Sequence, residues 1–278
     1  MNRLALIATF MTLSAASIPV ASAYEFYIAD DSDAPLRWFR KSLEYRLATT
    51  SPAEFAAAEL PNLASQAFEA WVGTACGKVP EVGFMGTSSA AQATKPTRLS
   101  DPPDNIIVFI ASSSKWSTPI EQGGLGNRPE WIAITKISHN TFTGEIVDAD
   151  IEVNDGGYKF SIDGTPGTDE IDFLAMLTHE VGHYFGLDHS AESDATMYAS
   201  YSRSPDKATE ARTLSADDEA GICALYTDVP ESPHEQVDDG DSGNGCATGS
   251  GGSLVFGLLM LARLRRRSPS APPGPTSS

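Results

Sequence analysis

The spacing of apolar residues changes several times along residues 24–228, and each spacing predicts a different kind of element. Over residues 54–73 apolar side chains recur every three or four positions, which predicts a long helix with one buried face. Short runs of branched and aromatic residues predict strands. The expected strands are residues 38–47, 82–85, 106–110, 131–137 and 146–153.

The last of these expected strands has two different faces. One face carries Asp148, Asp150 and Glu152, and the other carries only apolar residues. The acidic face has two interpretations: a solvated strand face followed by a turn at residues 155–157, or a set of oxygen ligands for Ca²⁺. The two glycines of the turn favour the first interpretation.

Two further helices are expected in the second half of the chain, at residues 169–185 and 215–226. Thr168 or Asp169 can cap the first helix and Ser215 the second, and acidic residues follow in each first turn, where the helix dipole favours them. Strands followed by helices predict an α+β domain with a mixed sheet packed on helices.

The first 23 residues have the form of a signal peptide. They combine an early arginine, an apolar stretch and a small-residue triplet that ends at Ala23, so we expect the mature chain to begin at Tyr24. An uncleaved membrane anchor is the alternative interpretation. Export implies an oxidising compartment.

The composition changes after residue 228, where the folded domain of residues 24–228 is expected to end. Residues 229–252 are rich in Pro, Asp, Gly and Ser, which is typical of a solvated linker. Residues 253–267 hold a short apolar run and then an arginine cluster, and the run is shorter than the roughly 20 residues of a spanning helix. Residues 268–278 are expected to be disordered.

Charge and cysteines narrow the range of functions. The formal net charge of −18 argues against a nucleic-acid partner, because phosphate binding needs clustered Lys and Arg; we ascribe most of the acidity to solubility. Cys76 and Cys223 both fall in the expected domain, whereas Cys246 lies in the tail. In an exported protein the first two are expected to form a disulfide, with two separate buried thiols as the alternative.

The chemistry is concentrated in the segment His-Glu-Val-Gly-His-Tyr-Phe-Gly-Leu-Asp-His, which begins at His179 and holds three of the five histidines. A helix places His179 and His183 on one face, where they can share a metal ion. Gly186 can end the helix and turn the chain, so that His189 returns as a third ligand. Three protein ligands leave one zinc position for water, as in catalytic sites, and Glu180 can take a proton from that water.

A methionine, Met197, follows the third histidine by a short polar loop. With it, the extended zinc motif resembles the metzincin clan of metallopeptidases. Ser190, directly after the third histidine, resembles the matrixin branch. Residues 131–154 and 214–226 also resemble strands and the last helix of bacterial matrixin-like domains.

The resemblance implies a metzincin-type catalytic domain. Its upper part has a twisted, mostly parallel five-stranded sheet and two helices, and a smaller C-terminal part holds the Met-turn at Met197 under one catalytic zinc. It also implies polypeptide substrates, which add as a strand to an antiparallel edge strand along the cleft. A second, structural zinc has no evident ligands, since residues 112–130 lack histidine. The expected edge-strand residues are Trp131, Ile132, Ala133, Ile134 and Thr135.

The tail around Cys246 resembles the C-terminal sorting tails of myxobacterial exported proteins, which implies attachment to the cell envelope. A weakly membrane-interacting end is the alternative. The predicted function is a monomeric zinc endopeptidase, secreted or attached to the cell surface. One rival is a surface-displayed protein-binding module with a non-catalytic zinc site, which the intact Glu180 argues against. The other is a serralysin-like peptidase, which Ser190 argues against.

Overall fold

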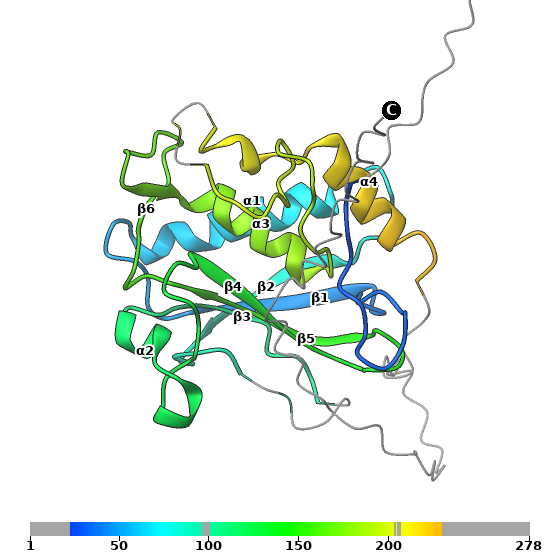
Figure 1. The fold of residues 1–278 in the computed structure, drawn as a ribbon, viewed down its shortest axis with the longest axis horizontal. Coiled ribbons are helices and arrows are strands. Elements are labelled where there is room, and N and C mark those ends of the chain that lie inside the picture. The colour runs from blue at the N-terminus through cyan, green and yellow to red at the C-terminus, as the bar shows by residue number, and fades with distance from the viewer. Residues whose placement is uncertain (1–22, 95, 97–100, 203, 205–206, 230–278) are drawn as a thin grey trace, which may run out of the picture.

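Five strands form one mixed sheet in the order β2-β1-β3-β5-β4 (Figure 1). The computed structural model describes residues 23–94, 96, 101–202, 204 and 207–229. All neighbouring strands are parallel except β4 and β5, which are antiparallel, as predicted for a mostly parallel mixed sheet. The strands are β1 (Ser42–Ala48), β2 (Glu81–Ser88), β3 (Ile106–Phe109), β4 (Ala133–His139) and β5 (Ile146–Val153).

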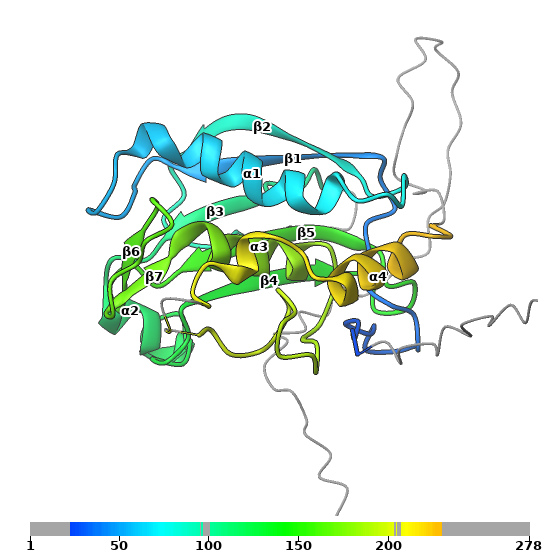
Figure 2. The same cartoon turned by 90° about the horizontal axis from the view of Figure 1, so that it is seen from above.

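Two long helices, α1 (Leu60–Val72) and α3 (Phe173–Tyr184), lie side by side on one face of the sheet (Figures 1 and 2). The last helix, α4 (Ala216–Leu225), begins at Ser215 with a capping box, as its sequence predicted. No helix in these described ranges is long and apolar enough to cross a bilayer. The short helices are η1 (Ala57–Glu59), α2 (Ser113–Ser117), η2 (Ile120–Gln122) and η3 (Glu210–Arg212).

Helix α3 begins later than predicted. Residues 170–172 form a strand, β7 (Glu170–Asp172), which pairs in parallel with β6 (Lys159–Ser161). The cap is therefore Asp172, which accepts a hydrogen bond from the backbone N–H of Ala175 at 2.9 Å, and the predicted caps Thr168 and Asp169 are wrong. A pairing between strands of three residues leaves little trace in apolar spacing.

The first strand also begins later than predicted. Trp38, expected at its start, is fully buried and donates from Nε1 to the carbonyl of Tyr184 at 2.8 Å. Its ring lies 5.3 Å from the Tyr184 ring, measured between centroids. The segment before β1 therefore packs against the end of α3 instead of extending the sheet.

The acidic face of β5 is buried, so the prediction of a solvated strand face is wrong. Asp150 accepts hydrogen bonds from the backbone N–H groups of Ile106 and Thr94, both at 2.6 Å. Glu152 forms an ion pair with Lys136 at 2.7 Å. Backbone that approaches from outside the strand thus covers the carboxylates, which strand periodicity alone cannot reveal.

A disulfide between Cys76 and Cys223 joins the segment after α1 to helix α4. Because these residues are 147 positions apart in the sequence, the bond closes a large loop and restricts the unfolded chain. It holds the C-terminal helix against the body that carries α3.

Candidate metal centre

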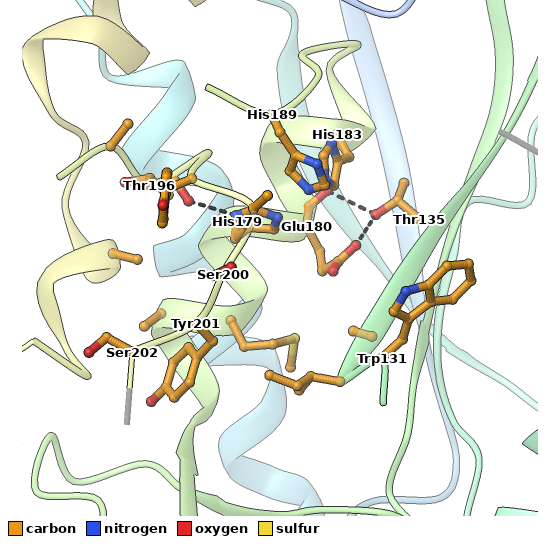
Figure 3. A pocket seen from close by; sticks show the side chains of 18 of the residues that line it. Trp131, Thr135, His179, Glu180, His183, His189, Thr196, Ser200, Tyr201 and Ser202 are labelled. Atoms are coloured by element: carbon orange, nitrogen blue, oxygen red, sulfur yellow. Dashed lines mark hydrogen bonds between the residues drawn. The ribbon is translucent and has the colours of Figure 1, made fainter. Parts of the chain in front are cut away.

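Helix α3 and the turn that follows it bring three histidines to the floor of a cleft (Figure 3). His179 and His183 lie one helical turn apart on α3. The helix ends at Phe185, and Gly186 follows with a φ angle of 103°, a backbone conformation that favours glycine. A Cβ atom at Gly186 would also lie 2.0 Å from the carbonyl oxygen of Leu36, so no other residue fits this turn.

The three imidazoles converge. Their nearest ligand atoms all lie within 4.8 Å of one another. The ring centroid of His183 lies 4.8 Å from that of His179 and 4.8 Å from that of His189. The centroids of His179 and His189 are 5.3 Å apart. Among the described residues, this is the one cluster of His, Cys, Asp or Glu that is close enough to hold a metal ion.

Hydrogen bonds at the far ring nitrogens set the orientation of the two helical histidines. Nδ1 of His179 lies 2.6 Å from the carbonyl oxygen of Thr196, and Nδ1 of His183 lies 2.8 Å from that of Leu187. Because a carbonyl oxygen only accepts, each Nδ1 carries the hydrogen. Each Nε2 therefore keeps its lone pair, as a metal ligand needs.

Burial keeps these imidazoles neutral. It lowers the pKa of His179 to about 4, with a further contribution from the neighbouring His189. It lowers the pKa of His183 well below the usual range. It also lowers the pKa of His189, although the neighbouring Asp188 opposes that shift. Neutral imidazoles with free lone pairs and no thiolate suit a zinc site with three protein ligands and an open fourth position. The residues therefore fit zinc.

Glu180 lies beside the histidines and is almost fully buried, with 6% of its surface exposed. The hydroxyl of Thr135 donates to its Oε2 at 2.6 Å (Figure 3). Burial raises the pKa of Glu180 to about 7, and the hydrogen bonds from Thr135 oppose that shift. A carboxyl group that changes protonation near neutral pH suits a general base.

The cleft in which this cluster lies has a volume of about 1160 Å³. One wall is the outer edge of the sheet, where β4 is the last strand, and residues 193–196, 198–202, 207, 208, 210 and 211 contribute to the opposite wall. At one rim the guanidinium of Arg128 lies 5.5 Å from the ring centroid of Trp131. All five predicted edge-strand residues line this cleft. Strand β4 begins only at Ala133, so the strand prediction is wrong for Trp131 and Ile132, whose carbonyls accept hydrogen bonds from Asn154.

Met197 lies in the core against α3. Its side chain is 1% exposed, and a Cβ atom at Gly182 would lie 2.2 Å from its sulfur. The backbone N–H groups of Thr196 and Met197 donate to the Asp218 carboxylate at 2.7 and 3.0 Å. Helix α4 thereby fixes the turn that supplies the Thr196 carbonyl to His179.

Two residues that contact the cluster were not predicted from the sequence to do so. Thr135 was predicted only as part of an edge strand, and Tyr27 was not singled out, although its hydroxyl lies 3.1 Å from Nδ1 of His183. Thr135 leaves one signal, because it is a polar residue on the helix-facing side of β4, between Ala133 and Ile137. Tyr27 leaves none, since 156 residues separate it from its partner.

Comparisons with known proteins agree with this geometry. Residues 100–227 match the family Peptidase_M10, described as Matrixin. Stromelysin-1 of Equus caballus is 43% identical over 63 residues, which are 23% of this chain and 13% of that protein. Matrix metalloproteinase-25 of Homo sapiens is 29% identical over 136 residues, 48% of this chain and 22% of that protein. Metalloendoproteinase 1-MMP of Arabidopsis thaliana is 37% identical over 71 residues, which are 25% of this chain and 18% of that protein.

The chain therefore spans between 13% and 22% of the length of these relatives. The matched segments and the five-stranded mixed sheet support a matrixin-like metallopeptidase, and they confirm the predicted α+β fold of a metzincin catalytic domain.

Proposed function

We propose that this chain is a zinc-dependent endopeptidase of the matrixin type, with zinc held by His179, His183 and His189. The observation that carries the proposal is the convergence of three neutral imidazoles, with ligand atoms within 4.8 Å, beside the buried carboxylate of Glu180. When bound, zinc supplies Lewis acidity and lowers the pKa of a bound water toward about 7.

The residues of the chain supply the rest of the chemistry. Glu180 accepts a proton from the attacking water and later passes it to the nitrogen of the leaving amine. Its low exposure leaves the carboxylate little contact with bulk water, which favours transfer of the proton within the site. The match to the matrixin family and the open position left by three ligands both support this assignment.

Strand β4 provides the means to hold a polypeptide. It is the last strand of the sheet, and its residues 133–135 line the cleft, so an extended peptide can pair with the backbone groups of its outer edge. Backbone pairing does not depend on the side chains of the substrate, which favours cleavage of extended polypeptides in general.

Export and attachment to the cell surface are part of the proposal. The signal peptide expected at residues 1–23 lies outside the described residues except for Ala23, and the tail expected at residues 229–278 lies outside them except for Val229. We retain a monomer as the working state. Detection of the mature N-terminus at Tyr24 by sequencing of the secreted protein would support export.

The decisive test compares the wild type with Glu180→Gln and His183→Ala. Glu180→Gln is expected to keep its zinc and to lose turnover by about 10²- to 10⁴-fold, the usual contribution of a general base. His183→Ala is expected to lose its zinc after dialysis. Casein cleavage and zinc content are measured on all three proteins, and a chelator should stop cleavage by the wild type.

Glu81→Gln, on the opposite edge of the sheet, serves as the matched control and should behave as the wild type. Near-normal cleavage by Glu180→Gln would remove the role assigned to this carboxylate. A wild type that binds zinc and cleaves no polypeptide would favour the alternative, a binding module with a non-catalytic zinc site.

A further inference from the structure

The side chain of Thr135 reaches from β4 across to helix α3. Its hydroxyl lies 2.6 Å from Oε2 of Glu180 and 3.0 Å from the backbone carbonyl oxygen of the same residue (Figure 3). The shorter distance is typical of a hydroxyl that donates to a charged carboxylate. The carbonyl oxygen provides a second acceptor, so the hydroxyl proton has a partner whether the carboxyl is charged or neutral.

The two oxygens of the Glu180 carboxylate therefore differ. Within the described part of the chain, the only side chain that donates to the carboxylate is Thr135, and its hydrogen bond ends at Oε2. Oε1 remains free to accept a proton, and the residue lines the cleft. A single hydrogen bond thus distinguishes the oxygen that is held from the oxygen that can react.

Thr135 is itself held firmly. Its backbone pairs with Ile151 in the antiparallel ladder between β4 and β5, with further pairs on either side of it. On the other face of β4, Lys136 forms its ion pair with the buried Glu152 at 2.7 Å. A donor on a strand that is held by its ladder to β5 and by the Lys136 ion pair can keep its partner in one orientation.

We propose that Thr135 is a positioning residue for the proposed peptidase reaction, in which its hydroxyl holds Oε2 of Glu180 and leaves Oε1 to take the proton. One O–H bond of the attacking water breaks, its proton binds Oε1, and the electron pair stays on the water oxygen, which attacks the scissile carbonyl carbon. As the new carbon–oxygen bond forms, the π electron pair of the carbonyl moves onto its oxygen. When that pair returns, the carbon–nitrogen bond breaks, and the nitrogen keeps the bonding pair and takes the proton from Oε1. This inference rests on the proposed function and adds a residue to it.

The test uses the secreted protein and three variants. Thr135→Val keeps the shape and the branched Cβ but removes the hydroxyl, whereas Thr135→Ser keeps the hydroxyl. Thr141→Val is the matched control, because its buried hydroxyl has no hydrogen-bond partner among the described residues. Zinc content, thermal unfolding, kcat and KM are measured on each protein, and the metal-free proteins are crystallised.

Thr135→Val is expected to keep its zinc and its KM, while kcat falls by about 10- to 100-fold, as for a reacting group displaced by roughly 1 Å. Thr135→Ser should recover most of kcat, and Thr141→Val should match the wild type. In the metal-free crystals, the Glu180 carboxylate should leave its position in Thr135→Val and keep it in Thr135→Ser.

An unchanged kcat in Thr135→Val, or a loss that serine does not rescue, would overturn the role of Thr135 while the proposed function stands. A wild type that cleaves nothing would overturn the proposed function instead. In that case an unmoved Glu180 carboxylate in the metal-free Thr135→Val crystals would refute the positioning role independently of activity.

Discussion

In His179 and His183, the hydrogen bond that Nδ1 makes determines how Nε2 faces the cleft. His179 donates to a carbonyl of the turn that ends at Met197, and His183 donates to the carbonyl of Leu187. The Tyr27 hydroxyl shares the second of these donors at 3.1 Å, and its ring lies 5.4 Å from the His183 ring. Such outer partners fix the tautomer and raise the basicity of a metal ligand.

Removal of the Tyr27 hydroxyl should therefore weaken zinc binding without abolishing it. In Tyr27→Phe the ring remains and Nδ1 of His183 keeps its bond to Leu187, so we expect a loss near the lower end of the usual range, about tenfold in zinc affinity. Competition with a chelator of known affinity measures this loss. Tyr24→Phe, in the same segment but without a contact to the histidines, should show no change; equal affinities for all three proteins would refute the role of Tyr27.

At the scale of single residues, the sequence predicted those site residues that lie close together in the chain. The period of the α-helix places His179 and His183 together, and a left-handed glycine lets the chain return to bring His189 near, so the ligand set follows from spacing alone. Thr135 and Tyr27 contact Glu180 and His183 from segments that are distant in the sequence. Their contacts depend on where β4 and the N-terminal segment pack, and no local period encodes that.

Strand β5 carries a second group of buried carboxylates, away from the cleft. Asp148 accepts a hydrogen bond from the backbone N–H of Asp104 at 3.0 Å. Burial raises its pKa to about 6 from the ordinary value of 3.8, and burial raises the pKa of Asp150 further. Backbone donors occupy both Asp150 oxygens, which favours a structural role over the Ca²⁺ site considered from the sequence.

The raised pKa of Asp148 predicts a pH-dependent stability. The folded protein binds a proton here at pH values where the unfolded chain has already released it, so the contribution is complete below about pH 4 and is lost as the pH rises through about 6. The unfolding free energy of the wild type relative to Asp148→Asn should therefore fall over this range. Urea unfolding of the metal-free proteins at several pH values measures the difference.

Histidine titration affects both of these proteins and largely cancels in the comparison. A difference that stays constant across the range would show that Asp148 has the same pKa in the folded and unfolded states. Calcium that raises the thermal stability of the wild type but not of Asp148→Asn would restore the cation interpretation of this face.

Among the helices and strands, the sequence predicted those whose apolar residues recur at a clear helical or strand spacing. The five sheet strands, α1 and α4 follow from apolar spacing and capping residues. The β6–β7 pair and the true start of α3 do not, because Asp172 is selected as the cap by a strand pairing and by Arg212, which donates to its carboxylate at 2.7 and 2.8 Å. Strands of three residues have no clear period of their own, and Arg212 is 40 positions away from Asp172 in the sequence.

At the scale of the whole molecule, segments from both ends of the domain meet at the turn between His183 and His189. The backbone N–H of Tyr27 donates to the carbonyl of Gly186 at 3.1 Å, and that of Asp188 donates to Glu25 at 2.9 Å. Helix α4, fixed by the Cys76–Cys223 disulfide, holds the Met197 turn through Asp218. The geometry of the histidines is thus a property of the folded domain rather than of the motif alone.

The most direct test of the account is anomalous diffraction at the zinc absorption edge from crystals of the purified protein. We predict one strong peak between the three imidazoles, with Nε2 of His179, His183 and His189 each about 2.0–2.1 Å from the metal. A zinc-loaded crystal with its peak elsewhere, or with any of these three rings turned away from the metal, would contradict the central claim.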